Sequence, residues 1–283
     1  EEKAAADKAA ADKAAEEKAA ADKAAEEKAA ADEAAAEEKA AADAEAARVA
    51  KSMTVNLTVN GDAGAAATTG EGDDTFNGAL VGAGTTGTTI QAGDSLAGGT
   101  GTDKLNISAT GAAGTYSLLG VQTSSIETVS LNDFTDAGIV TVDAVLMPGV
   151  EKVRLNSSGA NGDVAFSNLD RIVSAEMANG SGDLSLAFQA AAVVGKTDAT
   201  SLSVSNVTAG TFAQTGVETL TLSSSLTPNV LTAVTGMTTL NINAASNLTI
   251  GTALANTVTT VDATGSTGKV TLGVTAGGNV KVT

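Results

Sequence analysis

Two short segments rich in glycine and aspartate hold the residues of this sequence that are best suited to chemistry. They are GGTGTDKLN at 98–106 and TGEGDDTFN at 69–77. Each has glycines two positions apart, then an aspartate, then an apolar residue two positions after the aspartate. Glycine permits positive φ angles, so such a turn can aim its carbonyl groups inward while the aspartate adds a carboxylate. We therefore expect two tight turns, each lined with oxygen atoms.

Oxygen donors of this kind suit calcium, which takes about six to eight oxygen ligands, so one turn is not enough and two must face each other. Asp74 and Asp103 are 29 residues apart rather than the roughly 18 of two consecutive nonapeptides, so residues 78–97 should loop out or form an extra coil. We expect one or two sites at most, and tight turns without a metal are the alternative. The candidate ligands are Gly70, Gly72, Asp74, Gly99, Gly101, Asp103 and, from AGDSLAGG, Asp94.

Other chemistries are excluded by composition. The chain contains no histidine and no cysteine, so it cannot build a Ser-His-Asp triad, a thiol nucleophile or a zinc site made of Cys and His. Asp133 and Asp136, and likewise Asp170 and Arg171, are close in sequence, but neither pair has a second supporting cluster. We interpret them as surface turn residues, not as a catalytic carboxylate pair, and expect no enzyme.

The charge balance restricts the partners. The net charge is −17, which would repel the phosphate backbone of nucleic acids. No apolar run approaches the roughly 20 residues of a membrane-spanning helix. The sequence begins at Glu1 without a methionine and stops in a strand-like run, so we expect a piece of a longer protein.

Residues 1–52 are predicted to form one long helix. Ala, Glu and Lys favour helix, and no Gly or Pro interrupts the segment. Lysine recurs every five residues from Lys3 to Lys28, and this period rotates around a helix, so no fixed stripe of large apolar residues forms. We expect a solvated, semi-rigid spacer. The alternative is an alanine-lined association of several such helices.

Residues 53–283 are predicted to be β-rich. Short β-branched runs such as MTVNLTVNG (53–61) and KLNISATG (104–111) alternate with Gly, Asn and Asp turns. A degenerate unit recurs, in which an apolar residue, two polar residues and an alternating apolar run follow one another. Its copies begin at Ile126, Val150, Leu169, Val217, Met237 and Val258.

The copies are spaced by roughly 18 to 30 residues, many by about 20, which indicates a solenoid, in which stacked units bury apolar residues that one strand could not bury alone. The fold class is therefore mainly β, a parallel β-helix or solenoid preceded by a long Ala-rich helix. A β-sandwich is the alternative, because strand spacing alone does not separate the two.

The stretch 70–131 combines GEGDDTFNG, AGDSLAGGTGTDKLNI and SSIETVSL, and the last motif returns as GVEKVRLNS (149–157) and GVETLTLSS (216–224). In this order the segments resemble bacterial S-layer and adhesin-like proteins that carry RTX motifs. The resemblance covers most of 53–283 in texture and is specific over about sixty residues. It implies export, calcium-dependent folding outside the cell and assembly into a lattice, sheath or filament.

We therefore expect an extracellular structural protein of a bacterial cell surface that is stabilised by Ca²⁺ and self-assembles into a surface layer, sheath or filament. Its partners would be copies of itself and a cell-envelope polysaccharide. The alternative is a stalked adhesin that binds a glycan or an abiotic surface. The β-rich region offers one Tyr and five Phe, mostly at core-like positions, which argues against a sugar-stacking surface.

Overall fold

The computed structural model describes residues 2–82, 87–112, 114–136, 138–273 and 281–282, and it divides into two compact units at residues 50 and 51. The first unit is the helix α1 (Glu2–Val49), as predicted. In the described residues no helix is both long enough and apolar enough to cross a membrane. Lysine pairs with the acidic residue four positions later at several points, for example Lys18 with Asp22 at 2.7 Å.

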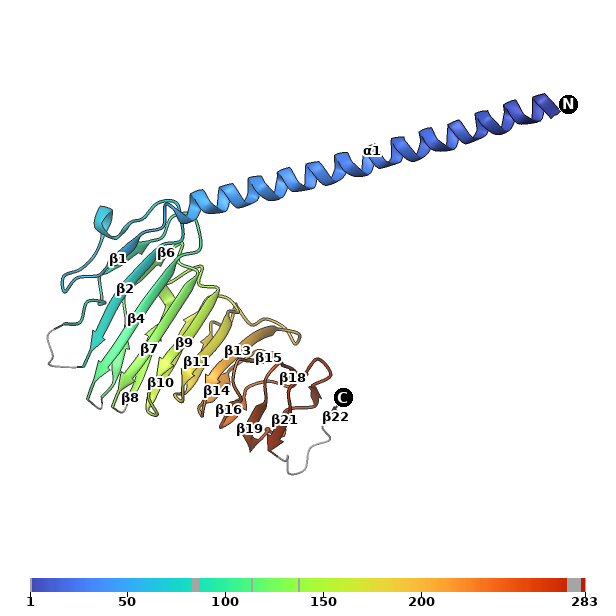
Figure 1. Ribbon diagram of the computed structural model, residues 1–283. Helices are drawn as coiled ribbons and strands as arrows, with labels where there is room; N and C mark the ends of the chain where they lie inside the picture. Colours follow the sequence, from blue (N-terminus) through green and yellow to red (C-terminus); the bar gives the residue numbers. More distant parts are fainter. Residues whose placement is uncertain (1, 83–86, 113, 137, 274–280, 283) are drawn as a thin grey trace. The chain divides into compact units, whose positions relative to one another are not determined.

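The second unit is a parallel β-solenoid of about nine coils (Figure 1). Within the described residues, the largest sheet has eleven parallel strands, which follow one another in chain order along the solenoid. These strands are β1 (Thr54–Asn56), β2 (Thr75–Val81), β4 (Lys104–Gly111), β7 (Thr128–Thr135), β9 (Lys152–Ser158), β11 (Ser174–Gly180), β13 (Ala199–Val207), β15 (Thr219–Ser225), β18 (Thr239–Ala244), β20 (Thr260–Asp262) and β22 (Lys281–Val282).

The other strands close the coils. The second sheet contains β5 (Tyr116–Leu118), β8 (Gly138–Asp143), β10 (Gly162–Leu169), β12 (Leu184–Phe188), β14 (Thr211–Gln214) and β17 (Ala233–Thr235). The smaller sheets contain β16 (Asn229–Leu231), β19 (Leu248–Ala253) and β21 (Val270–Gly273), and β3 (Ser95–Ala97) with β6 (Gln122–Ser124). Two short 3₁₀ turns are η1 (Gly64–Ala67) and η2 (Ala144–Leu146). All strand pairs among the described residues that have a defined register are parallel, for example β4 with β7, which excludes the antiparallel sandwich.

The core is a column of apolar side chains that repeats from coil to coil. In the register of the large sheet, Phe76 pairs with Leu105, Leu105 with Val129 and Val129 with Val153. All four side chains are fully buried. Each such residue contributes roughly 1.5–3 kcal/mol relative to an exposed side chain. The stack therefore supplies the burial that no single strand could achieve, as the repeat analysis predicted.

One repeat assigned from the sequence is out of register. The copy beginning at Leu169 was expected to place Ile172 in the central apolar position, but the residue paired with Val153 is Ala175. Leu169 instead ends β10 in the second sheet. Strand β11 reads SAEMANG, which lacks the β-branched pattern of the other copies. The apolar residues just before the strand therefore resembled the motif more closely than the strand itself.

The interval between the two glycine–aspartate turns is also explained. Residues 78–97 were expected to loop out or to add a coil. In the described part of this segment they complete the far side of a single coil, from the second half of β2 to β3. Successive coils differ in length, and equivalent residues are from 20 to 29 positions apart. The coil between the two turns has a longer far side than other coils. The turns therefore lie in adjacent coils although they are 29 residues apart.

Candidate cation site at the stacked glycine–aspartate turns

The two predicted turns lie directly on top of each other. Thr75 pairs with Lys104, so the segments that precede β2 and β4 occupy the same position in successive coils. The backbone amide of Thr100 donates to the carbonyl of Gly70 at 2.8 Å, and the amide of Gly72 donates to the carbonyl of Thr100 at 3.0 Å. The turns therefore face each other, as a shared cation site requires, and they are already joined by backbone hydrogen bonds.

Glycine is required at two positions of the second turn. Gly101 has a φ of 138°, and a Cβ atom on it would lie 1.8 Å from the carbonyl oxygen of Gly72. Gly99 has a φ of 88°, and its Cβ would lie 2.1 Å from the carbonyl oxygen of Gly70. Both the left-handed backbone and the close approach of the neighbouring coil exclude a side chain. The glycine spacing seen in the sequence is thus a consequence of stacking.

The two aspartates point into the coil and form a ladder. Asp74 and Asp103 are buried, with exposed fractions of 1 % and 0 %. Oδ1 of Asp74 accepts from the amide of Met53, and Oδ1 of Asp103 accepts from the amide of Asp74, both at 2.7 Å. In the next coil Oε2 of Glu127 accepts from the amide of Asp103 at 2.7 Å. Each carboxylate therefore caps the backbone of the coil before it.

Glu127 was not among the sequence candidates. It is the first of the two polar residues in the recurring unit that begins at Ile126. The sequence offered one signal for its position. Glu127 is two residues before Val129, just as Asp103 is two residues before Leu105, and Val129 pairs with Leu105 in the sheet. Glu127 therefore continues the ladder with a longer side chain.

At Asp74 this ladder contains a carboxylate oxygen that has no hydrogen-bond partner in the part of the chain that the structure describes. Oδ2 of Asp74 is buried without one, and the same is true of Oδ2 of Asp133 and of Asp198. An unsatisfied buried polar atom costs roughly 1–3 kcal/mol, and more when it is charged. Oδ2 of Asp74 is thus available as a ligand for a cation at the stacked turns.

Asp94 does not join the other predicted ligands. It lies at a different corner, immediately before β3, whereas Asp103 immediately precedes β4. Its Oδ1 accepts from the amide of Asp62 at 2.9 Å, and its Oδ2 accepts from the amide of Gln91 at 2.8 Å. With both oxygens engaged, Asp94 acts as a corner cap. Over the described residues, no group of three or more His, Cys, Asp or Glu side chains is placed to hold a metal ion.

Another buried carboxylate, Asp133, lies two residues before the end of β7. Burial raises the pKa of this group above its ordinary value, against the opposing hydrogen bonds from Thr135, and the charge of Asp163 raises it further. The amide of Thr135 donates to Oδ1 at 3.0 Å. The sequence analysis interpreted Asp133 and Asp136 as surface turn residues. For Asp133 this interpretation is wrong, because its side chain is fully buried within β7.

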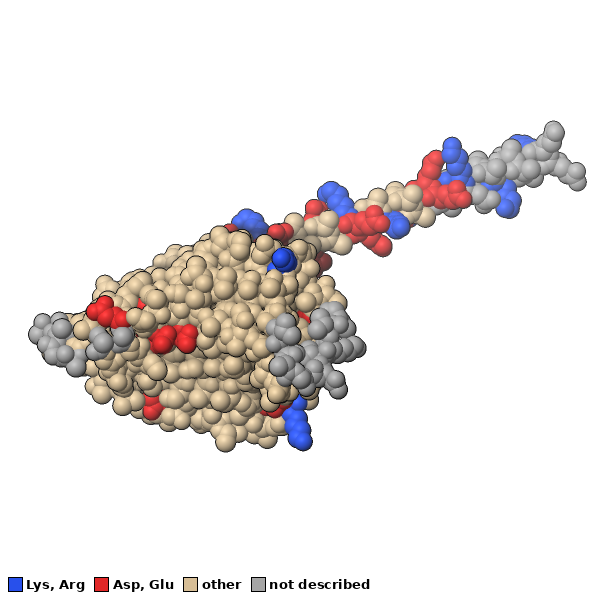
Figure 2. All heavy atoms as spheres, turned by 90° about the horizontal axis from the view of Figure 1, so that it is seen from below, with Lys and Arg blue, Asp and Glu red and all other residues tan. Residues whose placement is uncertain are grey.

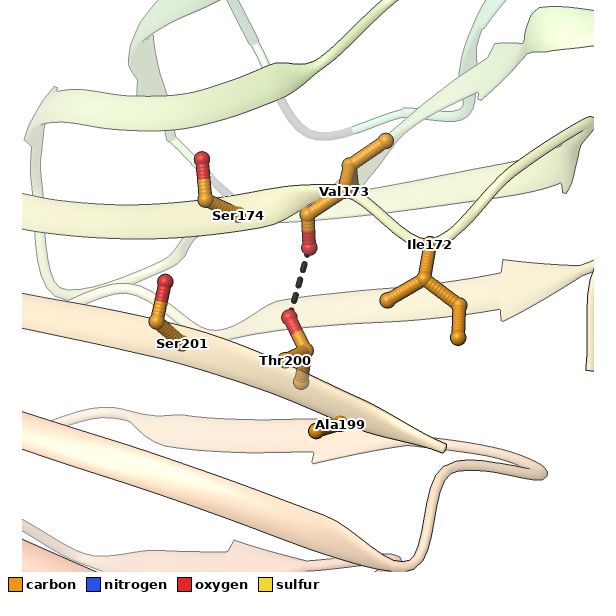
Figure 3. A pocket seen from close by; sticks show the side chains of 6 residues that line it. All are labelled: Ile172, Val173, Ser174, Ala199, Thr200 and Ser201. Atoms are coloured by element: carbon orange, nitrogen blue, oxygen red, sulfur yellow. Dashed lines mark hydrogen bonds between the residues drawn. The ribbon is translucent and has the colours of Figure 1, made fainter. Parts of the chain in front are cut away.

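A shallow hollow of about 290 Å³ lies between the starts of β11 and β13 (Figure 3). Its walls are formed by small and aliphatic side chains, and the Thr200 hydroxyl donates to the Val173 carbonyl at 2.6 Å. No titratable side chain lines it. The hollow therefore offers the hydroxyl groups of Ser174, Thr200 and Ser201, with no acidic or basic side chain among its lining residues.

No protein-family model, curated protein or solved structure matches this chain closely enough to indicate a relative.

Proposed function

We propose that this chain is an extracellular structural protein of a bacterial cell surface, which calcium stabilises and which self-assembles into a layer, sheath or filament. The observation that carries the proposal is the stacking of two glycine–aspartate turns in adjacent coils. This stacking aligns Asp74 with Asp103 and Gly70 with Gly99. The same turns carry the resemblance to RTX-bearing surface proteins.

The donor set fits calcium chemically. Carboxylates of Asp74 and Asp103 and carbonyl groups of the glycine turns would hold the ion, since calcium prefers oxygen ligands. The unpartnered Oδ2 of Asp74 supports this assignment. The stacked turns would supply two carboxylates, a small number of charged ligands that favours the weak affinities of extracellular modules, roughly 10⁻⁴–10⁻³ M. Metal that binds the folded state alone adds to folding free energy.

The outer surface of the solenoid supports a structural role. Asparagine side chains hydrogen-bond from coil to coil, with Asn77 donating to Asn56 and Asn106 donating to Asn77, each at 3.1 Å. Asn156 donates to Asn132 at 3.0 Å. These ladders rigidify the surface and repeat at the strand spacing of about 4.8 Å. A stiff, regular surface of this kind suits packing against identical copies.

The test is size and morphology of the purified chain in millimolar calcium and in chelator, by sedimentation and negative-stain electron microscopy. Calcium should produce ordered sheets or filaments that the chelator dissolves. Asp74→Asn and Asp103→Asn should abolish the calcium response while Asn Oδ1 still accepts the backbone amide. Asp183→Asn is the control, because Asp183 also accepts a backbone amide, from Thr211 at 2.6 Å, but lies outside the glycine turns. A monomer in both conditions would refute the proposal.

A further inference from the structure

A polar groove crosses the outward face of the large sheet, on the side opposite the buried column. Its volume is about 250 Å³, and it extends over β2, β4, β7 and β9. Three of its lining side chains are cations and three are threonines. This groove is separate from the carboxylate ladder, because the side chains of Asp74 and Asp103 point into the coil.

The register fixes how the groove residues are spaced. Thr75 pairs with Lys104, Lys104 with Thr128 and Thr128 with Lys152. These four side chains therefore form one row on the same face, perpendicular to the strands. Neighbouring strands are about 4.8 Å apart, so Lys104 and Lys152 are about 10 Å apart along the solenoid, with the Thr128 hydroxyl between them. Arg154 lies two residues beyond Lys152 on the same face.

The groove carries more positive than negative charge. Glu176 on β11 holds two of the cations, with Oε2 2.6 Å from Lys152 Nζ and Oε1 2.7 Å from an Arg154 guanidinium nitrogen. Asp73 is the other acidic residue, and its Oδ1 accepts from the Thr102 amide at 2.6 Å. In the described part of the chain, no carboxylate lies within ion-pair distance of Lys104. Three cations therefore face two carboxylates, in a protein whose net charge is −17.

Glu176 orients two of the cations. Burial raises the pKa of Glu176, but the hydrogen bonds and positive charges of Lys152 and Arg154 outweigh it and hold that pKa below its usual value. The carboxylate therefore stays ionised and keeps both cations over the sheet. Lys104, in the same row, has no ion pair with Glu176 among the described residues.

From this arrangement we propose that the groove binds an extended acidic polysaccharide that lies along the solenoid axis. Its carboxylates would meet Lys104 and the Lys152–Arg154 pair, and its hydroxyl groups would meet the threonines. Nucleic acid is disfavoured because its dense charge is repelled by the acidic protein, and a protein partner is disfavoured because the groove has no aromatic or apolar anchor. The inference does not rest on calcium-dependent assembly.

The direct experiment is isothermal titration of the purified chain with hyaluronate oligosaccharides, which carry a carboxylate on alternate sugars, in chelator and at low salt. Lys104→Thr should weaken binding about tenfold, since a charge-assisted hydrogen bond contributes about 1.5–3 kcal/mol and 1.4 kcal/mol is tenfold. Threonine fits this row, because Thr75 and Thr128 already occupy it on both sides. Lys196→Thr is the matched control, an exposed lysine elsewhere, and should bind like the parent chain.

A second variant separates binding from folding. Glu176→Gln removes the competing carboxylate and should strengthen hyaluronate binding several-fold, an effect that a merely structural role of Glu176 would not produce. The proposal would be overturned by no binding of hyaluronate, by equal weakening in Lys104→Thr and Lys196→Thr, or by equally tight binding of neutral dextran. Tighter binding of polyglutamate than of hyaluronate would assign the groove to an acidic polypeptide and would also overturn it. Circular dichroism of each variant checks the fold.

Discussion

In the helix α1, nearly every described side chain is exposed, whereas each coil of the β unit buries a row of apolar residues. Figure 2 shows the same contrast in charge. Acidic and basic side chains alternate along the helix, but the face of the β unit in view carries few of either. Several carboxylates of the β unit are instead buried inside the coils, among them those of Asp74, Asp94 and Asp103. Acidic side chains are thus exposed to solvent in the helix, whereas buried ones in the β unit accept hydrogen bonds from backbone amides.

The difference shows which interactions stabilise each unit. Ion pairs such as Lys28–Asp32, at 3.2 Å, are largely exposed to solvent, and pairs of this kind contribute about 0.3–0.5 kcal/mol each. The helix therefore depends on alanine propensity and on its length. The solenoid depends on close stacking, where a single added methyl group can collide with the next coil. The two units should respond very differently to small substitutions.

The largest expected effect is at Gly101. Gly101→Ala should destabilise the β unit by about 3 kcal/mol or more, because the new Cβ meets the Gly72 carbonyl oxygen in a tightly packed stack. Gly195→Ala is the matched control. Gly195 has a similar φ of 131°, but nothing lies within 4 Å of its Cβ position. Urea unfolding of both variants measures the difference, and equal losses would show that stacking is not the cause.

In the helix, Ala25→Pro should remove much of the helical circular dichroism. Proline costs about 3 kcal/mol in a helix interior through its missing amide and its clash with the preceding turn. Ala25→Ser should cost only a few tenths of a kcal/mol. The β-sheet signal should persist in both variants. Loss of that signal in Ala25→Pro would show that the solenoid depends on the helix.

A smaller effect is expected at the buried carboxyl of Asp133. Because folding raises its pKa above 3.8, its favourable contribution is complete below that pH and is lost as the pH rises through the raised value. Asp133→Asn should therefore stabilise the protein at pH 7 by about 1–2 kcal/mol and make little difference near pH 3. Asn Oδ1 still accepts the Thr135 amide. Unfolding at both pH values tests this, and a less stable variant at pH 7 would contradict it.

The smallest effect concerns backbone strain at Leu226. This residue has a φ of 64° and is 76 % exposed, so a bulky side chain occupies a left-handed conformation without packing in return. Leu226→Asn should stabilise the β unit by about 0.5–1 kcal/mol, since asparagine tolerates this region. Leu119→Asn, at another exposed leucine, should change the melting temperature little. A loss of stability in Leu226→Asn would show that its side chain has a packing role.

The sequence predicted the helix, the solenoid and the pairing of Asp74 with Asp103, because each depends on a local pattern that repeats. Three results depended on information that local patterns lack. The register of β11 was missed since Ala175 has too little apolar character to mark its position. Asp94 was grouped with the wrong turn because sequence proximity does not show which corner a residue occupies. Lys104, Lys152 and Arg154 were overlooked because only the strand register brings them together.

Calcium dependence of folding tests the central proposal most directly. The midpoint of urea unfolding would be measured in millimolar calcium, in millimolar magnesium and in chelator, for the parent chain and for Asp74→Asn with Asp103→Asn. We predict that calcium alone raises the midpoint of the parent chain and leaves the double variant unchanged, by the linkage of binding to folding. If the parent chain unfolds at the same urea concentration in all three solutions, the stacked turns are metal-free and the proposal is wrong.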